Sequence, residues 1–502
     1  MLNKSVKTEY YQTIVVGAGP AGLAACAGAF GAGASSVLLL EREAACGGIL
    51  NQCIHDGFGI IRYGQQLSGP EYASRGLAEA AASGALRIQT SAIVTEVEAV
   101  SSSCAQPASS KCAVSASSSC AQTAAPNLRV TVMSPEGLQI FDAGSVVLAT
   151  GCRERTRGMI SVPGSRPAGI YTAGVAQNLM NRRNVMPGKQ VVILGSGDIG
   201  LIMARRLTLE GAHVKAVVEI MNEPQGLARN VRQCVQDYGI PLYTAHTVSN
   251  IYGKKRLTSV DISAVDSSLR PVPGTVQNIP CDTLILSVGL IPENEVAETA
   301  GVSLDPRTNG ALTDDYLQTS VPGVFACGNC RAVMDLADLV SLQGEAAGAN
   351  AARFALGQNL QPWTQQQYNA ARKGMPVPGT VTCTLCPNGC QITATREGDP
   401  EKAPDGWIVT GNSCPKGKAF AITEMTRPVR ILTSTVRLAG ASDPLLAVRT
   451  DQPVPLDQFA LLMPLVRELH VQAPVEEGQV LLRNIGGTGA DLIAETSEGL
   501  SV

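Results

Sequence analysis

Two glycine clusters of the form G-x-G-x-x-G carry the clearest potential for chemistry in this chain of 502 residues. Residues 17–22 follow the apolar run 13–16, and residues 195–200 follow the apolar run 191–194. Glycines in this arrangement let backbone amides and a helix N-terminus approach a pyrophosphate. The pattern therefore predicts two dinucleotide-binding sites. The residues expected at the first site are Gly17, Ala18, Gly19, Pro20, Ala21 and Gly22, and those expected at the second are Gly195, Gly197, Asp198, Ile199 and Gly200.

An acidic residue completes each cluster. Glu41 and Glu219 each end a second apolar run, 19 residues beyond the last glycine of their cluster, where a carboxylate can hold ribose hydroxyls. Residues 220–224 contain no Lys or Arg to meet a 2′-phosphate, so NAD(H) is favoured over NADP(H) at the second site. Arg229 and Arg232 are the cations that could fold back to such a phosphate. The alternative for either cluster is a degenerate copy that binds nothing.

Four cysteines form a second candidate site near the C-terminus. Cys383, Cys386 and Cys390 are separated by two and three residues, and Cys414 follows after 23 residues. Four thiolates suit a [4Fe-4S] cluster or a structural zinc ion. The uneven spacing differs from the paired C-x2-C of zinc ribbons. The cluster is therefore the preferred prediction, zinc is second and free thiols are last.

The apolar runs between the motifs predict the elements that position them. Residues 12–100 begin as strand, helix and strand around the first glycine cluster. Residues 145–148 predict a buried strand that ends at the turn Thr150-Gly151. Residues 283–289 predict a strand that closes the second nucleotide unit, and residues 336–356 predict a helix.

A low-complexity tract interrupts this pattern at residues 101–126. The sequence SSSCAQ occurs twice in it, and large apolar side chains are almost absent. Such a composition cannot build a core. We expect a surface insertion between strands at residues 93–97 and 128–132.

The order of motifs over residues 12–356 resembles the two-dinucleotide-binding flavoprotein disulfide reductase superfamily. The resemblance implies an α/β fold in which a Rossmann-like FAD-binding domain carries an inserted Rossmann-like NAD-binding domain. It also implies that residues 319–329 return the chain to FAD, with asparagine at 329 where aspartate is common. The FAD-binding positions implied in this way are Glu41, Arg42, Gly47, Gly48, Val94, Thr150, Gly151, Gly328 and Asn329.

The predicted domain boundaries combine these motifs. They are residues 1–160 and 283–360 for the two parts of the FAD-binding domain, 161–282 for the NAD(H)-binding domain, 361–379 for a linker and 380–502 for a small cysteine-rich domain.

The chain departs from the disulfide reductases of that superfamily at the redox cysteines. Thioredoxin-reductase types need a C-x-x-C in the nicotinamide domain, and residues 152–281 contain none. Glutathione-reductase types need C-x4-C, whereas six residues separate Cys46 from Cys53. Cys327 and Cys330 have the C-x-x-C spacing but straddle the turn expected to contact FAD. No catalytic residue is convincing, and Cys46, Cys53 and His55 are weak candidates.

Residues 47–59, GGILNQCIHDGFG, resemble a narrower subgroup of flavoproteins. Its members accompany anaerobic-type glycerol-3-phosphate dehydrogenases and amino-acid or opine dehydrogenase complexes. There the flavoprotein relays electrons and a separate subunit handles the organic substrate. The resemblance implies FAD and NAD(H) as cofactors and a partner that resembles glycerol-3-phosphate dehydrogenase.

The C-terminal region carries two further resemblances. The cysteine spacing is similar to the N-terminal cluster-binding region of molybdopterin oxidoreductases, which holds [4Fe-4S]. Residues 380–502 resemble a small cysteine-bearing domain that often accompanies the flavoproteins just described. These resemblances imply an iron–sulfur cluster, with zinc as the alternative.

Composition limits the remaining possibilities. The net charge of −3 gives no sign of nucleic-acid binding. The apolar stretch 14–40 is interrupted by glycines and a proline, so it is not predicted to span a membrane. The 15 scattered cysteines and the N-terminal sequence favour a reducing cytoplasm. A hetero- or homo-oligomer is expected.

Three functions remain open from the sequence. The first is an electron-relay flavoenzyme subunit, and it is preferred. The second is a self-contained NADH oxidase, peroxidase or disulfide reductase that uses Cys46 or Cys53. The third is a non-catalytic interaction protein with a zinc-stapled docking module.

Overall fold

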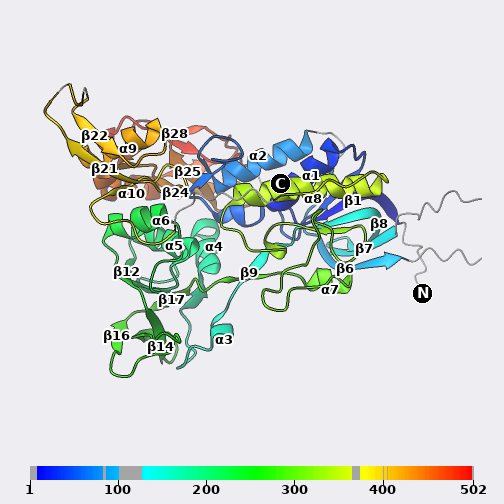
Figure 1. Cartoon of the computed structure of the whole chain (residues 1–502), viewed down its shortest axis with the longest axis horizontal. Helices are drawn as coiled ribbons and strands as arrows, with labels where there is room; N and C mark the ends of the chain where they lie inside the picture. Colours follow the sequence, from blue (N-terminus) through cyan, green and yellow to red (C-terminus); the bar gives the residue numbers. More distant parts are fainter. Residues whose placement is uncertain are drawn as a thin grey trace, which may run out of the picture. The chain divides into compact units, whose positions relative to one another are not determined.

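The computed structural model describes residues 8–82, 86–100, 127–364, 373–399, 401–403 and 405–499. It contains two compact units, whose helices and strands are labelled in Figure 1. The first unit consists of the described residues within 1–50, 73–153 and 291–366, and the second of those within 51–72, 154–290 and 367–502. The predicted insertion at 101–126 lies outside the described residues, and the division into five segments stays a prediction.

A seven-stranded sheet organises the first unit. Its strands are β1 (Glu9–Val16), β2 (Val37–Leu40), β5 (Leu86–Gln89), β6 (Ile93–Val100), β7 (Asn127–Ser134), β8 (Gly137–Leu148) and β19 (Val324–Ala326). The order is β5-β2-β1-β8-β7-β6, with β19 also paired to β8. The pairs among β5, β2, β1, β8 and β19 are parallel, whereas β6, β7 and β8 form an antiparallel meander. The strands predicted at 93–97, 128–132 and 145–148 are confirmed.

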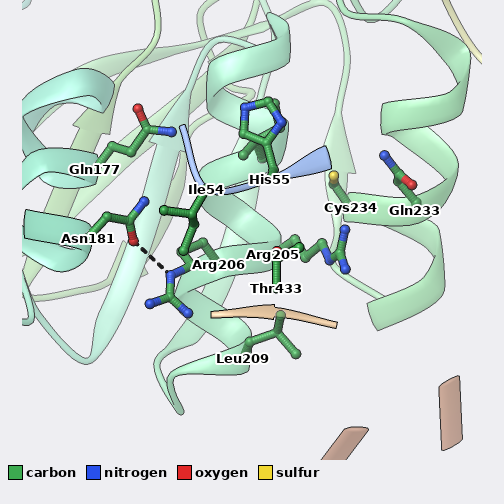
Figure 2. Close-up of a pocket in the computed structure, with 11 residues that line it drawn as sticks. Ile54, His55, Gln177, Asn181, Arg205, Arg206, Leu209, Gln233, Cys234 and Thr433 are labelled. Carbon is green, nitrogen blue, oxygen red and sulfur yellow. Dashed lines mark hydrogen bonds between the residues drawn. The ribbon is translucent and has the colours of Figure 1, made fainter. Parts of the chain in front are cut away.

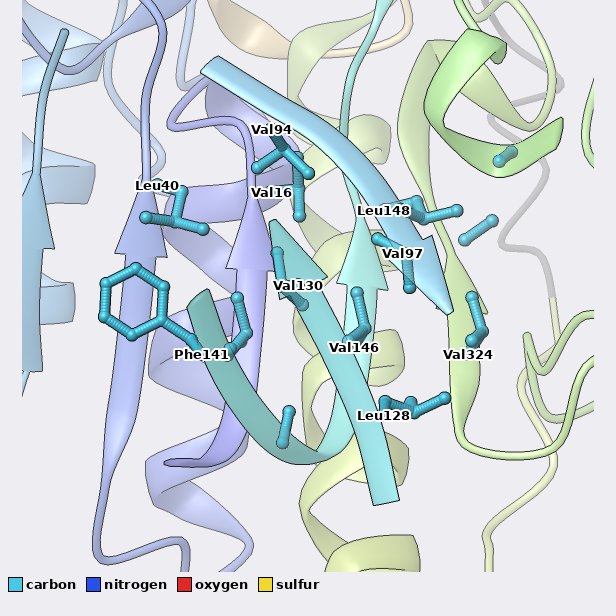
Figure 3. Packing of buried hydrophobic residues seen from close by; sticks show 14 of the residues in the cluster. Val16, Leu40, Val94, Val97, Leu128, Val130, Phe141, Val146, Leu148 and Val324 are labelled. Atoms are coloured by element: carbon cyan, nitrogen blue, oxygen red, sulfur yellow. The ribbon is translucent and has the colours of Figure 1, made fainter. Parts of the chain in front are cut away.

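Alternate residues of β1 face two different cores, as the period of a strand requires. Ile14 and Val16 pack on the side of the meander, where Figure 3 shows Val16 beside Val94. Val15 packs on the opposite face, against α1 (Pro20–Gly31) and α8 (Ala337–Ala355). These two helices lie side by side in Figure 1. The helix predicted at 336–356 is confirmed.

The second unit contains its own parallel sheet. Its order is β10-β17-β11-β12-β13, with bounds β10 (Ile170–Thr172), β11 (Gln190–Leu194), β12 (His213–Val218), β13 (Leu242–Tyr243) and β17 (Thr283–Leu286). The helices α4 (Ala173–Arg183), α5 (Asp198–Leu209) and α6 (Ala228–Cys234) accompany it. An antiparallel sheet is built from β14 (His246–Gly253), β15 (Leu257–Ala264) and β16 (Gln277–Pro280). β17 is the strand predicted at residues 283–289. As predicted, it is the last strand along the chain to join this parallel sheet.

The C-terminal segment belongs to the same compact unit. A small sheet of β20 (Val381–Thr382), β21 (Gln391–Arg396) and β22 (Trp407–Thr410) precedes α9 (Pro415–Thr426). A five-stranded sheet of order β27-β24-β25-β29-β28 follows, with α10 (Phe459–Glu468). Its bounds are β24 (Thr433–Ala439), β25 (Leu445–Thr450), β27 (His470–Gln472), β28 (Val480–Leu482) and β29 (Leu492–Ala494), and β23 (Val429–Arg430) pairs with β26 (Val454–Pro455). Leu209 of α5 is buried in this C-terminal core.

The remaining elements are short connectors and one longer helix. They are β3 (Asp56–Phe58), β4 (Leu67–Ser68), α2 (Gly69–Ala81), β9 (Cys152–Glu154), α3 (Arg157–Ile160), β18 (Leu290–Pro292) and α7 (Glu295–Thr299). Within the described ranges, no helix combines the length and the apolar character needed to span a bilayer.

Candidate functional site

The first glycine cluster forms a tight turn between β1 and α1. Gly17 has a φ of +100°, and a Cβ there would lie 2.5 Å from the carbonyl oxygen of Ala149. A Cβ on Gly22 would lie 1.8 Å from the oxygen of Gly17. Only glycine fits at these two positions, because the helix must start immediately after the strand.

Glu41 is tied to this turn. It is buried, and one carboxylate oxygen accepts the backbone N–H of Ala18 at 2.7 Å. The other oxygen accepts the N–H of Glu43 at 2.8 Å. The carboxylate is therefore held at the end of β2, next to the amides that would face a pyrophosphate.

The second cluster repeats this local structure. Gly195 also has a φ of +100°, and its Cβ would lie 2.0 Å from the oxygen of Ser287. The carboxylate of Glu219 accepts the N–H of Ser196 at 2.9 Å and the N–H of Met221 at 2.8 Å. Both predicted acids thus occupy the same place in two copies of one turn, although they lie 178 positions apart in the sequence.

Other predicted FAD positions converge on the first cluster. Gly47 donates its N–H to the oxygen of Ala18 at 2.8 Å. A Cβ on Gly48 would lie 3.1 Å from the Cα of Gly19. A Cβ on Gly328, which has a φ of +70°, would lie 2.9 Å from the Cβ of Ala21. Segments distant in the sequence therefore meet at the turn through glycines that leave no side chain in the way.

The turn at Gly328 is held by a residue that the sequence patterns did not predict. The side-chain oxygen of Gln343, in α8, accepts the N–H of Gly328 at 2.7 Å. Asn329 accepts the N–H of Met334 at 3.0 Å through Oδ1, and its Nδ2 lies 3.5 Å from the Sγ of Cys152. A glutamine within a helix pattern carries no sequence signal for this contact.

Several predicted side chains are engaged within the protein. Arg42 forms an ion pair with Glu293 at 3.2 Å, and Val94 is buried in the core beside the meander. Thr150, which precedes Gly151 in the predicted turn, donates its hydroxyl to the carbonyl of Glu293 at 2.6 Å. Asp198 accepts the N–H of Leu227 and the side chain of Asn230, both at 2.8 Å. Their contacts with a dinucleotide stay predictions.

The two cations considered for a 2′-phosphate are placed elsewhere. Arg232 forms ion pairs with Asp237 at 3.1 Å and Glu424 at 3.2 Å. Arg229 is buried, and a Cβ on Gly57 would lie 2.0 Å from its Nη2. Both guanidinium groups are therefore held by other parts of the second unit.

The cysteines considered for redox chemistry are held as thiols. No disulfide forms among the cysteines that the structure describes. Burial raises the pKa of Cys46 to about 11, and Glu41 acts in the same direction. Burial raises the pKa of Cys53 to about 12, opposed by its contact with Gln177. Because the thiolate is the nucleophile, neither side chain is activated near neutral pH.

His55 lines a pocket in the second unit. Figure 2 shows it with Gln177 and Asn181 of α4, Arg205 and Arg206 of α5, and Cys234. Arg206 points to Asn181 and donates to its Oδ1 at 2.9 Å. Two consecutive arginines within the apolar run of α5 were the overlooked sequence signal for this polar interior.

The His55 ring is held neutral in this environment. Burial lowers its pKa to about 4, the neighbouring Asp56 opposes this, and the charges of Arg229 and Arg205 lower it further. Its Nδ1 lies 3.1 Å from the carbonyl oxygen of Asp56. A general-acid role near neutral pH therefore has no support from the electrostatics.

The four predicted metal ligands come from one hairpin and one helix start. The N–H of Cys383 donates to the oxygen of Cys390 at 2.9 Å, directly beyond the pairing of β20 with β21. Cys386 lies in the intervening turn, which closes with a bond from Gly389 N–H to its carbonyl at 3.3 Å. Cys414 is the N-cap of α9, and α9 packs against β20 and β21.

These contacts bring the four thiols into one neighbourhood. Burial raises the pKa of Cys383 to about 11, and the other three thiols each raise it further. Four thiols are the donor type that a thiolate-ligated centre uses, but their arrangement in the structure does not form one. In the part of the chain that the structure describes, no group of three or more His, Cys, Asp or Glu side chains is arranged to hold a single metal ion as it stands.

Two known protein families match parts of this chain. Residues 11–353 match the model of the pyridine nucleotide-disulphide oxidoreductase family. Residues 415–496 match a family described only as a protein of unknown function, DUF1667. That second match begins after Cys414, so it contains none of the four cysteines.

Among curated proteins, this chain is 26% identical to an opine oxidase subunit of Agrobacterium tumefaciens, over 64% of this chain and 61% of the relative. It is 29% identical to rhodocoxin reductase of Rhodococcus erythropolis, over 44% of this chain and 51% of the relative. The matched part of the chain thus spans about half to three-fifths of the length of these relatives.

Solved structures show the same fold. Thioredoxin reductase of T. acidophilum matches with a TM-score of 0.53 and 21% identity, over 70% of this chain and 99% of that one. Thioredoxin reductase of Lactococcus lactis matches with a TM-score of 0.53 and 20% identity, over 69% of this chain and 99% of that one. The α/β fold with two Rossmann-like units is thereby confirmed. The chain belongs to the pyridine nucleotide-disulphide oxidoreductase family, whose members are FAD-dependent oxidoreductases linked to NAD(P)H.

Proposed function

We propose that this chain is an electron-transfer subunit that connects NAD(H) and FAD with a [4Fe-4S] cluster on Cys383, Cys386, Cys390 and Cys414. The observation that carries the proposal is the presence, in one chain, of two dinucleotide turns and a separate neighbourhood of four thiols. FAD supplies the conversion between hydride transfer and single-electron transfer when it is bound. The residues of the chain supply placement and electrostatics.

The preference for NAD(H) rests on Glu219. Its carboxylate is fixed on the second glycine turn, where it can accept hydrogen bonds from a ribose diol and repels a 2′-phosphate. Of the two cations that could reverse this preference, Arg232 forms ion pairs with Asp237 and Glu424, and Arg229 donates to the carbonyl oxygen of Thr384.

Electron relay is favoured over disulfide reduction because neither candidate thiol is activated. Cys46 and Cys53 both have strongly raised pKa values. The relatives also include rubredoxin-NAD(+) reductase of Pseudomonas putida, 26% identical over 38% of this chain and 47% of the relative, whose name states an electron-carrier reaction. The Cys46→Ser, Cys53→Ser double variant is expected to keep full NADH turnover with an artificial electron acceptor. Loss of that turnover would favour the oxidase or disulfide reductase alternative.

The organic substrate is proposed to belong to a partner dehydrogenase subunit. Glycerol-3-phosphate is the leading candidate, from the resemblance of residues 47–59. The match to the opine oxidase protein favours an amino-acid or opine dehydrogenase as the second candidate, because that relative is itself named as one subunit of an oxidase. Oxidation of glycerol-3-phosphate by this chain alone would contradict the assignment to a partner.

The decisive experiment is anaerobic purification followed by an optical spectrum and assays of iron, acid-labile sulfide and zinc. Flavin bands with about four iron and four sulfide per chain are expected. Flavin with one zinc ion and no sulfide would make the C-terminal centre structural. Absence of flavin would favour the interaction-protein alternative.

A further inference from the structure

We propose that the pocket beside His55 binds a small organic carboxylate, with Arg205 as its cationic partner. The pocket belongs to the second unit, and its lining residues come from residues 54–55, from α4, α5 and α6, and from β24 of the C-terminal segment. These residues lie outside both glycine turns and outside the four candidate metal ligands. The inference is therefore independent of the proposed electron transfer, and the two can fail separately.

The pocket has room for an occupant of a few heavy atoms. The volume open to the centre of a water molecule is about 20 Å³, whereas one buried water needs about 10–15 Å³. Ile54, Ile202 and Leu209 give the pocket an apolar wall, and Arg205 and Gln177 bring polar groups to it. An organic carboxylate matches both kinds of wall, because it has an apolar end and a charged end.

Arg205 is a buried cation with an unused donor. It is 6% exposed, and its Nε has no hydrogen-bond partner among the residues that the structure describes. Its Nη2 donates to the carbonyl oxygen of Ile431 at 3.0 Å, and this partner carries no charge. Burial of a charge is costly unless the charge is paired. A planar guanidinium pairs best with a carboxylate, which can accept two of its N–H groups together.

The neighbouring Arg206 already has its counter-charge. Its Nη1 donates to Glu210 at 2.6 Å, and its Nε donates to Asn181 at 2.9 Å, as Figure 2 shows. Glu495 is a further acid that acts on Arg206, but burial holds the pKa of Glu495 well above its usual range, which favours its neutral form. Arg206 therefore frames the pocket, whereas Arg205 is the lining arginine available to an anion.

The charges around His55 leave a place for one more anion. Burial lowers the pKa of His55, Arg229 and Arg205 lower it further, and Asp56 raises it. One carboxylate thus faces two arginines around this ring. That carboxylate also accepts a hydrogen bond from the side chain of Gln66. Asp56 alone therefore does not balance both buried cations.

The other acids on this side of the pocket have partners of their own. Burial raises the pKa of Cys234, and Asp198 and Asp237 act in the same direction, so both acids lie near this lining residue. Asp237 forms an ion pair with Arg430 at 2.8 Å. Asp198 accepts the side chain of Asn230 at 2.8 Å. An added carboxylate in the pocket would supply the missing negative charge.

Thermal unfolding of the full chain at pH 7 tests this site. Replacing chloride by about 50 mM acetate at equal ionic strength is expected to raise the unfolding temperature of the wild type by about 3 °C. Arg205→Gln removes the cationic partner and is expected to lose most of this rise. A full rise in Arg205→Gln would overturn the proposal.

Two controls make the test specific. Arg157→Gln removes another arginine of the same unit, which donates to the carbonyl oxygens of Val162, Gly164 and Ser165 and does not line the pocket. It is expected to keep the acetate effect, and an equal loss in both variants would overturn the proposal. Phosphate lacks an apolar end, so its Arg205-dependent effect is expected to be smaller than that of acetate. A larger effect of phosphate would overturn the assignment to a carboxylate.

A second measurement on the wild type does not depend on how a variant folds. The sequence has four histidines, and nuclear magnetic resonance of selectively ¹³C-labelled histidine follows each of them. Acetate is expected to shift the signal of His55, which is assigned by its loss in His55→Gln. His246 reports on the second glycine turn, because its N–H donates to the carbonyl oxygen of Glu219 at 2.9 Å. A shift of His246 alone, or of none of the four signals, would overturn the proposal.

Discussion

Glu41 and Glu219 are equivalent residues in two copies of one turn, so each can serve as the control for the other. Each carboxylate accepts two backbone N–H groups and is buried. We expect Glu219→Gln to weaken NADH binding about tenfold, since a charge-assisted hydrogen bond contributes about 1.5–3 kcal/mol. Its flavin content is expected to equal that of the wild type. Binding is measured by titration of the purified protein with NADH.

The matched variant Glu41→Gln should behave in the opposite way. It is expected to lose FAD on dilution while the second dinucleotide site retains its affinity for NADH. If Glu219→Gln released flavin and left NADH binding intact, the assignment of the two turns would be reversed.

His55 makes stability depend on pH. Its pKa in the folded chain is about 4, below the ordinary value of 6.5, because it is buried near two arginines. The folded state therefore excludes a proton that the unfolded chain binds. This contribution is fully present above pH 6.5 and is lost as the pH falls toward 4.

The corresponding test compares two histidine variants. Between pH 7.5 and pH 4.5, the thermal unfolding temperature should fall less steeply for His55→Gln than for the wild type. The free energy of unfolding lost over this pH range should be smaller for the variant by up to about 3 kcal/mol. His213→Gln changes an exposed residue and should follow the wild-type profile. Parallel profiles for all three proteins would show that His55 is not buried as a neutral ring.

At the scale of elements, the contact between α1 and α8 depends on glycine. A Cβ on Gly348 would lie 1.9 Å from the oxygen of Ala25, and one on Gly344 would lie 2.1 Å from the oxygen of Ala21. A Cβ on Gly28 would lie 2.0 Å from the oxygen of Glu345. The helix that starts at the first dinucleotide turn is therefore held backbone to backbone by a helix more than 300 residues later in the sequence.

Gly348→Ala should separate these helices. We expect it to lower the free energy of unfolding by about 2–3 kcal/mol, since overpacking moves the backbone, and to weaken FAD retention. Gly31→Ala is the matched control, because Gly31 is exposed at the end of α1 with no atom within 4 Å of its Cβ. That change should be neutral or stabilising by up to about 1 kcal/mol. Equal losses in both variants would remove packing as the cause.

At the scale of the whole molecule, a buried ion-pair network connects the C-terminal segment with the Rossmann-like fold that carries the second glycine cluster. Arg430 of β23 contacts Asp237 at 2.8 Å and Glu424 of α9 at 2.7 Å. All three side chains are nearly inaccessible to water. The segment that carries the four cysteines is thus fixed on the fold that carries the second glycine cluster.

Arg430→Met should loosen that attachment. Removing Arg430 leaves two buried carboxylates with only the partly exposed Arg232 as a counter-charge, which costs up to about 3–5 kcal/mol. Urea unfolding and limited proteolysis of the C-terminal segment measure the effect. Arg270→Ala breaks the exposed pair with Asp266 and should cost at most about 1 kcal/mol. Protection of the segment in Arg430→Met equal to that in Arg270→Ala would contradict a tethering role.

The sequence by itself determined the local chemistry of this protein. The two glycine turns, their glutamates, the strands that flank them and the positions of the four cysteines follow from residues close together in the chain. Close spacing is sufficient there because a turn of positive φ and a carboxylate at the next strand end are local requirements.

Only the tertiary structure decided how distant residues meet. The contact of Gln343 with Gly328, the packing of Arg229 on Gly57 and the network around Arg430 join segments with no common spacing or period. Such contacts depend on how whole helices and sheets pack. Many different sequences fit the local pattern around one residue equally well, so that pattern does not identify its distant contacts. The candidate ligands could therefore be predicted from the sequence, whereas the charges around them are set by the fold.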